Sequence, residues 1–513
     1  MRIISKKEDI LGQCSDLLSD ESKISGGIPS MIAFPESVKD LCDIITSAKK
    51  DKQKITFIGG HTGTTGGSLP IDNSTAVSFS RMKKILKIKL DSCNQPILLC
   101  EPGVTLSEIT EFLDNPEMWS YQVPGTELLK GKRYCYLPDP TELTAQLGGT
   151  VSTNASGARS FRFGPTRNHI HSLSMVFPSS DTFYVERGTD IAPQKGFTIT
   201  TEQDNLITID PFSFRSPDIK NAAGFYAASP MDLIDLFIGS EGTLAAFSSI
   251  GIRIYEKSTF TSGCSFFPSR KAAFSFADFL RTDKQICSIE FFDSSALAFI
   301  EQYRKHFPDI IPSFPPDSNQ AILWEYIEND PDPFETRFPI WESELLRRGS
   351  SFDKTWCGIE SREIERLKKF RHALPEMVNL TISKYKSLCR SIRKIGTDSA
   401  LPSGVFTDIY ENILKIIETE KITHTAFGHL GNYHIHINLL PSNEHELQKS
   451  IDLYDIIMNM VIHNNGTISA EHGIGKLKKK YLISMYGHDK IEQMKKIKTA
   501  FDPFWQFNPE TLF

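Results

Sequence analysis

The chain has 513 residues, which is long for one hydrophobic core and predicts two or three domains. With 57 Lys and Arg against 63 Asp and Glu, its net charge of −6 argues against a nucleic-acid-binding protein. No stretch approaches the roughly 18 apolar residues of a membrane span. The N-terminus carries early positive charge without an apolar core behind it, so we expect a cytoplasmic protein without a signal peptide. Peripheral contact with the inner face of a membrane is left open.

The nine cysteines are scattered along the chain, and no two of them form a Cys-x-x-Cys pair. An odd and dispersed set is typical of reduced thiols in a cytosolic protein rather than of a disulfide framework. It also excludes an iron–sulfur cluster held by locally clustered cysteines. Any electrons that this protein moves therefore need another carrier.

The first half of the chain is rich in short apolar runs that end in glycine. Residues 55–58 and 97–100 are predicted strands, each followed by a glycine-containing turn. Residues 105–113 have helical spacing, with Leu106 and Ile109 on one face. Residues 179–222 are polar and rich in turn formers, which indicates an extended hairpin or an insertion.

The composition changes after a predicted strand over 250–255. Aromatic and charged segments with helical spacing follow, such as residues 360–373. We therefore place a domain boundary near residue 256. The fold class is expected to be α+β, with two domains.

A glycine-rich loop follows the first of these strands, from Gly59 to Ser68. Glycines permit positive φ and let backbone N–H groups converge on a phosphate without obstruction by a Cβ atom. The loop lacks the lysine of a P-loop and matches the Rossmann spacing poorly. A tight or flexible turn is the alternative interpretation.

Two further loops resemble the first in character. Residues 148–159 and 239–244 combine small side chains with backbone and hydroxyl donors. Three such loops in one domain indicate a long ligand with several polar groups, and a dinucleotide fits that description better than a single phosphate.

Histidines gather near the C-terminus. In a strand beginning at His434, the side chains of His434, His436 and Asn438 share one face, and His429 precedes them in a turn. Glu471 and a neighbouring histidine follow in a glycine-flanked loop. Two imidazoles and a carboxylate suit Zn²⁺ or a similar divalent ion. A chance cluster of histidines along a strand is the alternative, and the pattern alone leaves both open.

These stretches together resemble the FAD-linked oxidases of the vanillyl-alcohol oxidase (PCMH) type. Within that superfamily they are similar to D-2-hydroxy-acid dehydrogenases, the branch that acts on D-lactate, D-2-hydroxyglutarate or glycolate. The resemblance covers roughly residues 28–256 and 360–513. It implies a PCMH-type FAD-binding domain over 28–256 and a ferredoxin-like substrate (cap) domain over 257–513. The last part of the cap, 465–513, is expected to return towards the flavin.

The resemblance also implies which residues bind FAD. The backbone of the first loop holds the pyrophosphate, residues of the second stretch line the flavin and adenosine, and the third loop approaches the cofactor. The implied positions are Gly59, Gly60, His61, Thr62, Gly63, Thr64, Thr65, Gly66, Pro138, Thr141, Gly149, Thr153, Asn154, Gly157, Gly164, Gly242 and Thr243.

His61 departs from the hydroxy-acid branch, which usually carries Gly or Asn at this position. In other branches a Gly-Gly-His-Ser motif supplies the histidine that bonds covalently to the flavin. One hypothesis is therefore a covalent histidyl-flavin at His61. The alternatives are a hydrogen bond to a phosphate and a histidine packed within the loop.

In the histidine region, the resemblance implies that His429, His436 and Glu471 bind a divalent metal, with Zn²⁺ or a similar ion expected. It implies that His472 is the catalytic base and that Asn438 contacts the substrate. Asn432, Tyr433 and His434 replace the family's usual Asp, Gly and Asn. We interpret His434 as a neighbour of the metal rather than a ligand.

Two cations resemble those that bind the substrate carboxylate in the family, Arg371 and Lys394. Arg suits this task because its guanidinium contacts a carboxylate through two parallel hydrogen bonds. The alternative for both is a solvated charge, the usual fate of such residues. Pro375 stands where the hydroxyglutarate branch has Thr, which disfavours that substrate.

The expected activity is oxidation of a small D-2-hydroxy acid, similar to D-lactate, to the 2-oxo acid by hydride transfer to flavin N5. We expect a separate electron acceptor: a quinone, a cytochrome or an electron-transfer flavoprotein. A homodimer is left open. The alternatives are a non-redox flavoenzyme of the alkylglycerone-phosphate synthase type, an oxidase of another alcohol, and a plain binding protein.

Overall fold

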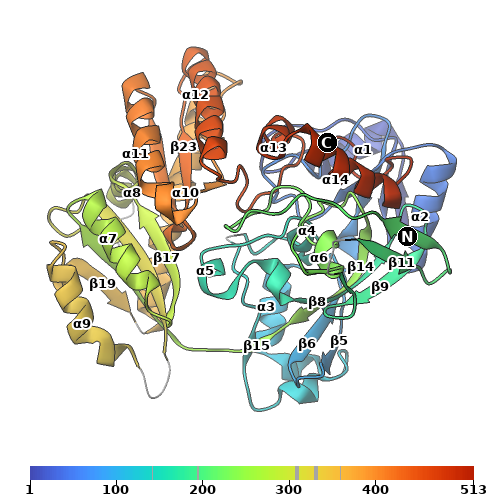
Figure 1. The fold of residues 1–513 in the computed structure, drawn as a ribbon, viewed down its shortest axis with the longest axis horizontal. Helices are drawn as coiled ribbons and strands as arrows, with labels where there is room; N and C mark the ends of the chain where they lie inside the picture. Colours follow the sequence, from blue (N-terminus) through green and yellow to red (C-terminus); the bar gives the residue numbers. More distant parts are fainter. Residues whose placement is uncertain (141, 193–195, 307–310, 329–332, 359) are drawn as a thin grey trace. The chain divides into compact units, whose positions relative to one another are not determined.

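The computed structural model describes residues 1–140, 142–192, 196–306, 311–328, 333–358 and 360–513. The chain divides into two compact units (Figure 1). The first unit comprises Met1–Gly157, Gly164–Lys257 and Ser469–Phe513, and the second comprises Ala158–Phe163 and Ser258–Ile468. The boundary near 256 expected from the sequence lies beside Lys257, whereas the C-terminal segment joins the first unit and residues 158–163 join the second.

The first unit contains two main sheets. One has four strands in the order β1-β2-β4-β3, and the other has five antiparallel strands in the order β5-β6-β14-β8-β9. The strands of this unit are β1 Arg2–Ile4, β2 Met31–Phe34, β3 Ile55–Ile58, β4 Thr75–Ser78, β5 Ile85–Leu90, β6 Pro96–Cys100, β7 Tyr134–Cys135, β8 Ile170–Val176, β9 Thr182–Glu186, β10 Ile191–Ala192, β11 Phe197–Thr200, β12 Leu206–Ile209, β13 Met231–Asp232, β14 Ala246–Arg253 and β15 Tyr255–Glu256.

Two helices of the first unit, α2 (Val38–Lys50) and α3 (Leu106–Asp114), begin at a residue whose side chain caps them. α3 is capped by Thr105, whose hydroxyl accepts from the Glu108 backbone N–H while the Glu108 carboxylate accepts from the Thr105 N–H. Its buried face includes Leu106 and Ile109, which confirms the predicted helix. The helices are α1 Lys7–Gln13, α2 Val38–Lys50, α3 Leu106–Asp114, α4 Leu147–Ser152, α6 Ile234–Phe237, α13 Lys479–Tyr486 and α14 His488–Phe501.

The C-terminal segment is built into the first unit. Phe507 pairs with Ile55 of β3, and its ring packs edge-on against Phe57 with the centroids 4.7 Å apart. The Asn508 side chain accepts a hydrogen bond of 2.8 Å from the Phe57 backbone N–H. The end of the chain therefore belongs to the core beneath the first glycine-rich loop.

The second unit is built on one eight-stranded antiparallel sheet, with the order β19-β16-β18-β17-β22-β23-β20 and β21 paired to β23. Its core gathers aromatic residues such as Phe266, Phe292 and Phe370, and includes residues of α8 (Ser294–His306) and α10 (Ser361–Leu388), on which Phe370 lies. The strands are β16 Phe260–Phe267, β17 Ile286–Phe292, β18 Gln320–Ile327, β19 Thr355–Gly358, β20 Ile395–Gly396, β21 Ser399–Ala400, β22 His424–Gly428 and β23 His434–Leu439.

Helices cover this sheet, and α11 and α12 lie side by side near β23 (Figure 1). The helices of the second unit are α5 Ser160–Phe163, α7 Arg270–Arg281, α8 Ser294–His306, α9 Phe334–Leu346, α10 Ser361–Leu388, α11 Ser403–Glu420 and α12 Glu444–His463. The expected α+β class is confirmed. Among the described helices, none has the length and apolar run that crossing a bilayer requires.

Candidate functional site

The three glycine-rich loops of the first unit meet one another. A Cβ atom on Gly59 would lie 3.8 Å from the Cα of Gly149, so the first and second loops are adjacent. The third loop joins the second through a hydrogen bond of 2.8 Å from the Glu241 N–H to the Ser152 carbonyl. Segments far apart in the sequence thus form a single surface of backbone groups and small side chains.

The glycines of this surface fall into two kinds. A Cβ atom on Gly149 would meet no described atom within 4 Å, and one on Gly63 would meet nothing nearer than 3.8 Å. By contrast, a Cβ atom on Gly60 would lie 2.8 Å from the Thr144 carbonyl oxygen, and one on Gly157 would lie 2.0 Å from that of Asp139. The second kind lets backbones pack closely, whereas the first leaves room for a ligand. The loops therefore fit a cofactor with an extended polar portion.

Several of the predicted cofactor residues make contacts within the fold. The Thr243 hydroxyl donates to the Ser240 carbonyl over 2.7 Å, and the Asn154 side chain accepts from the Arg167 N–H over 2.9 Å. Gly164 and Gly242 both have positive φ, at 80° and 68°. Thr141 lies outside the described residues. The rest of the predicted set is carried by the first two loops and by Pro138, which is buried.

The loop that carries His472 is fixed against the first glycine-rich loop. The Thr65 hydroxyl donates to the His472 carbonyl over 3.3 Å, and the Lys476 N–H donates to the Thr65 carbonyl over 2.9 Å. A Cβ atom on Gly475 would lie 2.2 Å from that carbonyl oxygen, so only glycine fits there. The structure therefore places the predicted base beside the predicted pyrophosphate loop.

Glu241 ties the third loop to the same segment. Its carboxylate accepts hydrogen bonds of 2.7 Å from the Ile474 N–H and 2.8 Å from the Gly475 N–H. Burial raises the pKa of Glu241 to about 7, although both N–H donors and the charge of Lys478 oppose that rise. The sequence places this glutamate in the third loop but indicates no role for it, because its partners lie more than 230 residues further along the chain.

A second residue that sequence reasoning missed is Lys220. Its ammonium group forms a buried ion pair with Glu471, and it also donates to the Gly157 carbonyl over 3.1 Å. The Ser156 hydroxyl donates to the same carboxylate over 3.4 Å. Glu471, a predicted metal ligand, is thus held by a lysine and a serine of the first unit. Nothing in the local sequence around Lys220 indicated this pairing.

His61 lies in the first loop with a positive φ of 59°. Burial lowers the pKa of its imidazole, while the carboxylates of Asp16 and Asp20 and a hydrogen bond with the Ser19 backbone oppose that shift. The ring thus has close partners in the N-terminal segment. These neighbours agree with a packed histidine, and the role of His61 towards the flavin stays a prediction.

His429, His434 and His436 of the second unit stand on the hairpin formed by β22 and β23. The sequence predicted the strand, and the structure confirms it as His434–Leu439. η7 (Leu430–Asn432) and Tyr433 form the turn. Tyr433 adopts a left-handed conformation with φ 53°, where the resembling family has glycine. The guanidinium of Arg281 lies 4.0 Å from the centre of the Tyr433 ring and also donates to the Leu430 carbonyl, so it supports the turn.

The structure brings three imidazoles together. His429, His434 and His436 each offer a ring nitrogen, and these nitrogens lie within 4.8 Å of one another. The ring centroids are 5.4 Å apart for His429 and His434, 5.9 Å for His429 and His436, and 4.3 Å for His434 and His436. Such a cluster could hold a divalent ion after small side-chain movements.

Each of these histidines faces an acceptor on a neighbouring strand or loop. His436 Nδ1 lies 3.1 Å from the Thr397 carbonyl oxygen, and His434 Nε2 lies 3.2 Å from Asp398 Oδ1. His429 Nδ1 lies 3.9 Å from Glu290 Oε2. The His436 contact is a hydrogen bond of the kind that fixes the orientation and tautomer of imidazoles that bind metals. The donor set therefore fits a metal on chemical grounds.

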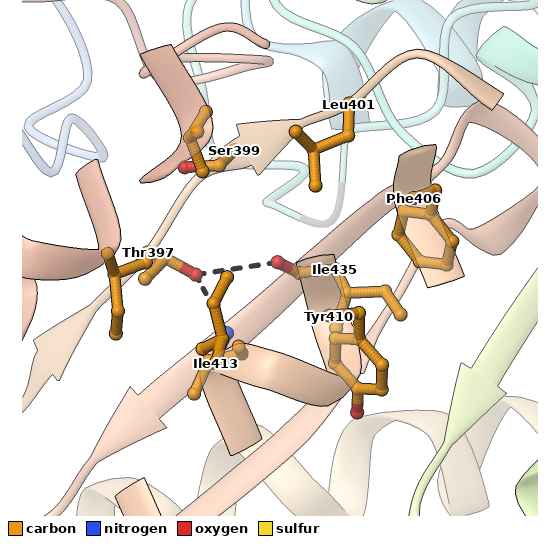
Figure 2. Close-up of a pocket in the computed structure, with 10 residues that line it drawn as sticks. Thr397, Ser399, Leu401, Phe406, Tyr410, Ile413 and Ile435 are labelled. Carbon is orange, nitrogen blue, oxygen red and sulfur yellow. Dashed lines mark hydrogen bonds between the residues drawn. The ribbon is translucent and has the colours of Figure 1, made fainter. Parts of the chain in front are cut away.

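Thr397 is itself held firmly against β23. Its hydroxyl accepts from the Ile437 N–H over 2.9 Å and donates to the Ile435 carbonyl over 3.4 Å, as Figure 2 shows. Ile435 and Ile437 line a small, mostly apolar cavity with Phe406 and Tyr410 of α11. The two faces of β23 are therefore distinct, with polar ligands on one face and packing residues on the other.

Arg371, the predicted carboxylate anchor, lies on α10 and pairs with Glu290. Its Nε lies 2.9 Å from Oε2 and 2.7 Å from Oε1 of that carboxylate. Glu290 therefore stands between Arg371 and His429. Arg371 also lowers the pKa of Glu325, which is held near 2 by the bidentate partner Arg159 despite burial that opposes ionisation.

Asn438 and Lys394, the other two predicted substrate contacts, differ in their exposure to solvent. Asn438 is buried on β23, and its side-chain amide donates to the Thr425 hydroxyl over 3.5 Å. Lys394 is exposed on the segment before β20. The second unit therefore groups Arg371 with the histidines through Glu290.

Two family models match the chain. Residues 257–512 match the C-terminal domain of the FAD linked oxidases, and residues 29–127 match an FAD binding domain. The solved structures that resemble the chain include an alkyldihydroxyacetonephosphate synthase, with a TM-score of 0.61 and 15% identity over 95% of this chain and 78% of that one. At that identity the likeness shows the fold alone.

Curated relatives match over nearly the whole chain. A glycolate oxidase subunit, GlcD, of Bacillus subtilis is 24% identical over 95% of this chain and 89% of its own length. A D-2-hydroxyglutarate dehydrogenase of Stutzerimonas stutzeri is 24% identical over 96% and 93%. A mitochondrial D-lactate dehydrogenase [cytochrome] of Arabidopsis thaliana is 22% identical over 94% and 73%. With both family models in sequence order and relatives of this kind, the chain is an FAD-dependent oxidoreductase and belongs to the FAD-linked oxidases, in the branch of the D-2-hydroxy-acid dehydrogenases.

Proposed function

We propose that the protein oxidises a small D-2-hydroxy acid, similar to D-lactate, to the corresponding 2-oxo acid. The relatives named for D-lactate, D-2-hydroxyglutarate and glycolate support a hydroxy acid as the substrate. The observation that carries the proposal is the cluster of oriented imidazoles beside the Glu290–Arg371 pair in the second unit. An arginine and a metal-binding cluster are what recognition of a carboxylate and an adjacent hydroxyl requires.

The residues that would hold FAD are those of the three loops. The open positions at Gly59, Gly63 and Gly149 leave room for the cofactor, while Glu241 and Thr65 fix the loops against the segment that carries His472. When bound, FAD supplies an acceptor for the hydride that leaves the substrate α-carbon. The protein's task is to place that carbon and its hydroxyl group correctly.

Arg371 would bind the substrate carboxylate through its guanidinium, whose planar group of N–H donors suits a carboxylate. His429 and His436 would hold a divalent ion, which supplies Lewis acidity that lowers the pKa of a hydroxyl group. His472 would accept the hydroxyl proton as general base. Glu471 as a further ligand, and Asn438 and Lys394 as substrate contacts, complete the proposed roles. In the balance of the reaction, the α-carbon loses a hydride and the oxygen loses a proton.

The electrons then leave for a separate acceptor, which we propose to be a quinone, a cytochrome or an electron-transfer flavoprotein. The dispersed cysteines of the sequence contain no Cys-x-x-Cys pair that would hold a relay of clusters.

The test is anaerobic reduction of the bound flavin by a panel of D- and L-2-hydroxy acids, followed by visible absorption. We expect rapid bleaching with a short D-2-hydroxy acid and much slower bleaching with its L-enantiomer. A flavin that no hydroxy acid bleaches would refute the proposal and leave the non-redox synthase chemistry or another alcohol as the activity.

A further inference from the structure

His434 is the one member of the imidazole cluster to which the resemblance gives no role. It occupies the position where related sequences carry asparagine, and its side chain is fully buried on β23. Because side chains alternate along a strand, His434 points to the same face as His436, two residues further on. Its ring centroid lies 4.3 Å from that of His436, the shortest of the three separations in the cluster.

The spacing of the cluster agrees with three imidazoles around one ion. Zn–N bonds of about 2.1 Å at tetrahedral angles place ligand nitrogens about 3.4 Å apart. The nitrogens of His429, His434 and His436 already lie within 4.8 Å of one another. Closing the remaining distance requires shifts of about an ångström, which rotation of the imidazoles can supply.

Asp398 provides the second part of the argument. Its carboxylate is 1% exposed, and Oδ1 lies 3.2 Å from Nε2 of His434. A carboxylate beside one imidazole nitrogen favours one orientation and tautomer of the ring. His436 is oriented in the same manner by the Thr397 carbonyl, the residue before Asp398. One short segment between β20 and β21 therefore contacts two histidines of the cluster.

We infer that His434 is a metal ligand alongside His429 and His436, and that Asp398 is its positioning residue. In this chain the metal site of the second unit thus carries three imidazoles. Asp398 also supplies a carboxylate beside the cluster, whereas Asn432 stands where the resembling sequences carry an aspartate. The inference rests on the proposed function only in assuming that the cluster binds a divalent metal.

The experiment uses the FAD-loaded full-length enzyme, stripped of metal and titrated with Zn²⁺ against a competing chelator. The main variant is H434N, because asparagine is the residue of the resembling sequences and keeps a polar side chain in the buried site. H445A serves as the matched control, since His445 is an exposed histidine on α12 of the same unit. Zinc X-ray absorption of each loaded protein counts the imidazoles bound to the ion.

We expect H434N to bind Zn²⁺ at least about 100-fold more weakly than the wild type and to show one imidazole fewer. We expect D398N to bind about 10-fold more weakly with the imidazole count unchanged, and H445A to match the wild type. If H434N does not fold, the D398N titration decides. A Zn²⁺ affinity of H434N equal to that of the wild type would overturn the inference and make the His434–Asp398 pair purely structural. If only D398N folds, a wild-type Zn²⁺ affinity in D398N would have the same meaning. A wild type that binds no Zn²⁺ would overturn it as well.

Failure of this inference can be told apart from failure of the proposed function. If the wild-type flavin is bleached by a D-2-hydroxy acid while H434N binds Zn²⁺ normally, only the ligand assignment fails. If Zn²⁺ affinity depends on His434 but no hydroxy acid bleaches the flavin, only the proposed substrate class fails.

Discussion

The candidate sites of the two units are formed by different groups, backbone atoms of loops in the first unit and side chains of a strand in the second. In the first unit, backbone groups of three loops form the surface, and side chains such as Glu241 and Thr65 act mainly by holding loops together. In the second unit, side chains on a regular strand form the cluster, and the backbone contributes an orienting carbonyl at Thr397. A long cofactor with phosphates is suited to the first arrangement, whereas a small ion is suited to the second.

This difference determines what a substitution does. In the first unit, the effect of adding a side chain depends on which atoms already surround the glycine. In the second unit, the chemistry of the replaced side chain matters more than its volume. We therefore expect glycine variants of the first unit to lose FAD binding, and side-chain variants of the second unit to lose metal binding or activity while they keep FAD.

The largest effect is expected from H472A. Because His472 would accept the substrate proton, flavin reduction by a D-2-hydroxy acid should slow by about 10²- to 10⁴-fold. The FAD content should stay normal, since the loop is held by its backbone contacts with Thr65 and Glu241. Anaerobic stopped-flow absorption measures the rate. Reduction at the wild-type rate would remove His472 from the proposed role.

The two kinds of glycine in the first unit can be compared directly. G149V places a side chain in open space, so it should leave folding intact and weaken FAD binding by about 10- to 100-fold. G157V drives a Cβ atom against the Asp139 carbonyl and should destabilise the unit by about 1–3 kcal/mol.

The control for G149V is G404V, because Gly404 also faces open space but lies on an exposed part of α11. Flavin fluorescence titration and urea unfolding are the two measurements. Equal FAD affinity in G149V and G404V would show that the cofactor does not pass Gly149.

Glu241 should make the stability of the first unit depend on pH. Its pKa rises from 4.5 to about 7 on folding, so between these values the folded chain holds a proton that the unfolded chain releases. Its contribution to stability is therefore complete below pH 4.5 and is lost as the pH rises through 7, by up to about 3 kcal/mol.

The variant E241Q removes that titration and should flatten the pH dependence of the free energy of unfolding between pH 5 and 8. A constant offset is expected as well, because a glutamine offers one acceptor oxygen to the two N–H groups of Ile474 and Gly475. Urea unfolding at several pH values measures both. Parallel profiles for the variant and the wild type would contradict the assignment.

A smaller effect is expected from D20N. Asp20 lies beside the first loop, with Oδ2 3.8 Å from a Cβ atom built on Gly63, and burial raises the pKa of its carboxyl. Its charge should repel a pyrophosphate bound at this end of the loop, so D20N should tighten FAD binding by about 3- to 10-fold. No change in the dissociation constant would place the phosphates away from Gly63.

The smallest effect is expected from H61A. Because His61 is largely buried and lies near the carboxylates of Asp16 and Asp20, we expect a non-covalent flavin in the wild type and in the variant. Acid precipitation should release the yellow colour into the supernatant in both proteins. Colour that stays with the wild-type pellet and leaves the H61A pellet would establish the covalent bond instead.

The elements that sequence reasoning predicted are those with local signals. The helix beginning at Leu106 and the strand beginning at His434 have clear periodicity, and the glycine-rich loops follow apolar runs. The roles of Glu241, Glu290 and Asp398 had no such signal, because each depends on a partner that is distant in sequence. Glu290, for example, meets Arg371 only because β17 lies beside the helix that carries that arginine. Charged residues of this kind are usually solvated, so the pattern alone favoured no role for them.

The most direct test of the account combines both units in one measurement. The FAD-loaded enzyme is mixed anaerobically with D-lactate, before and after removal of divalent metal, and the flavin absorption is followed. The account predicts rapid bleaching that is lost with the metal and restored by adding Zn²⁺ or a similar ion. Bleaching at the same rate in the metal-free enzyme, or no bleaching by any D-2-hydroxy acid, would contradict it.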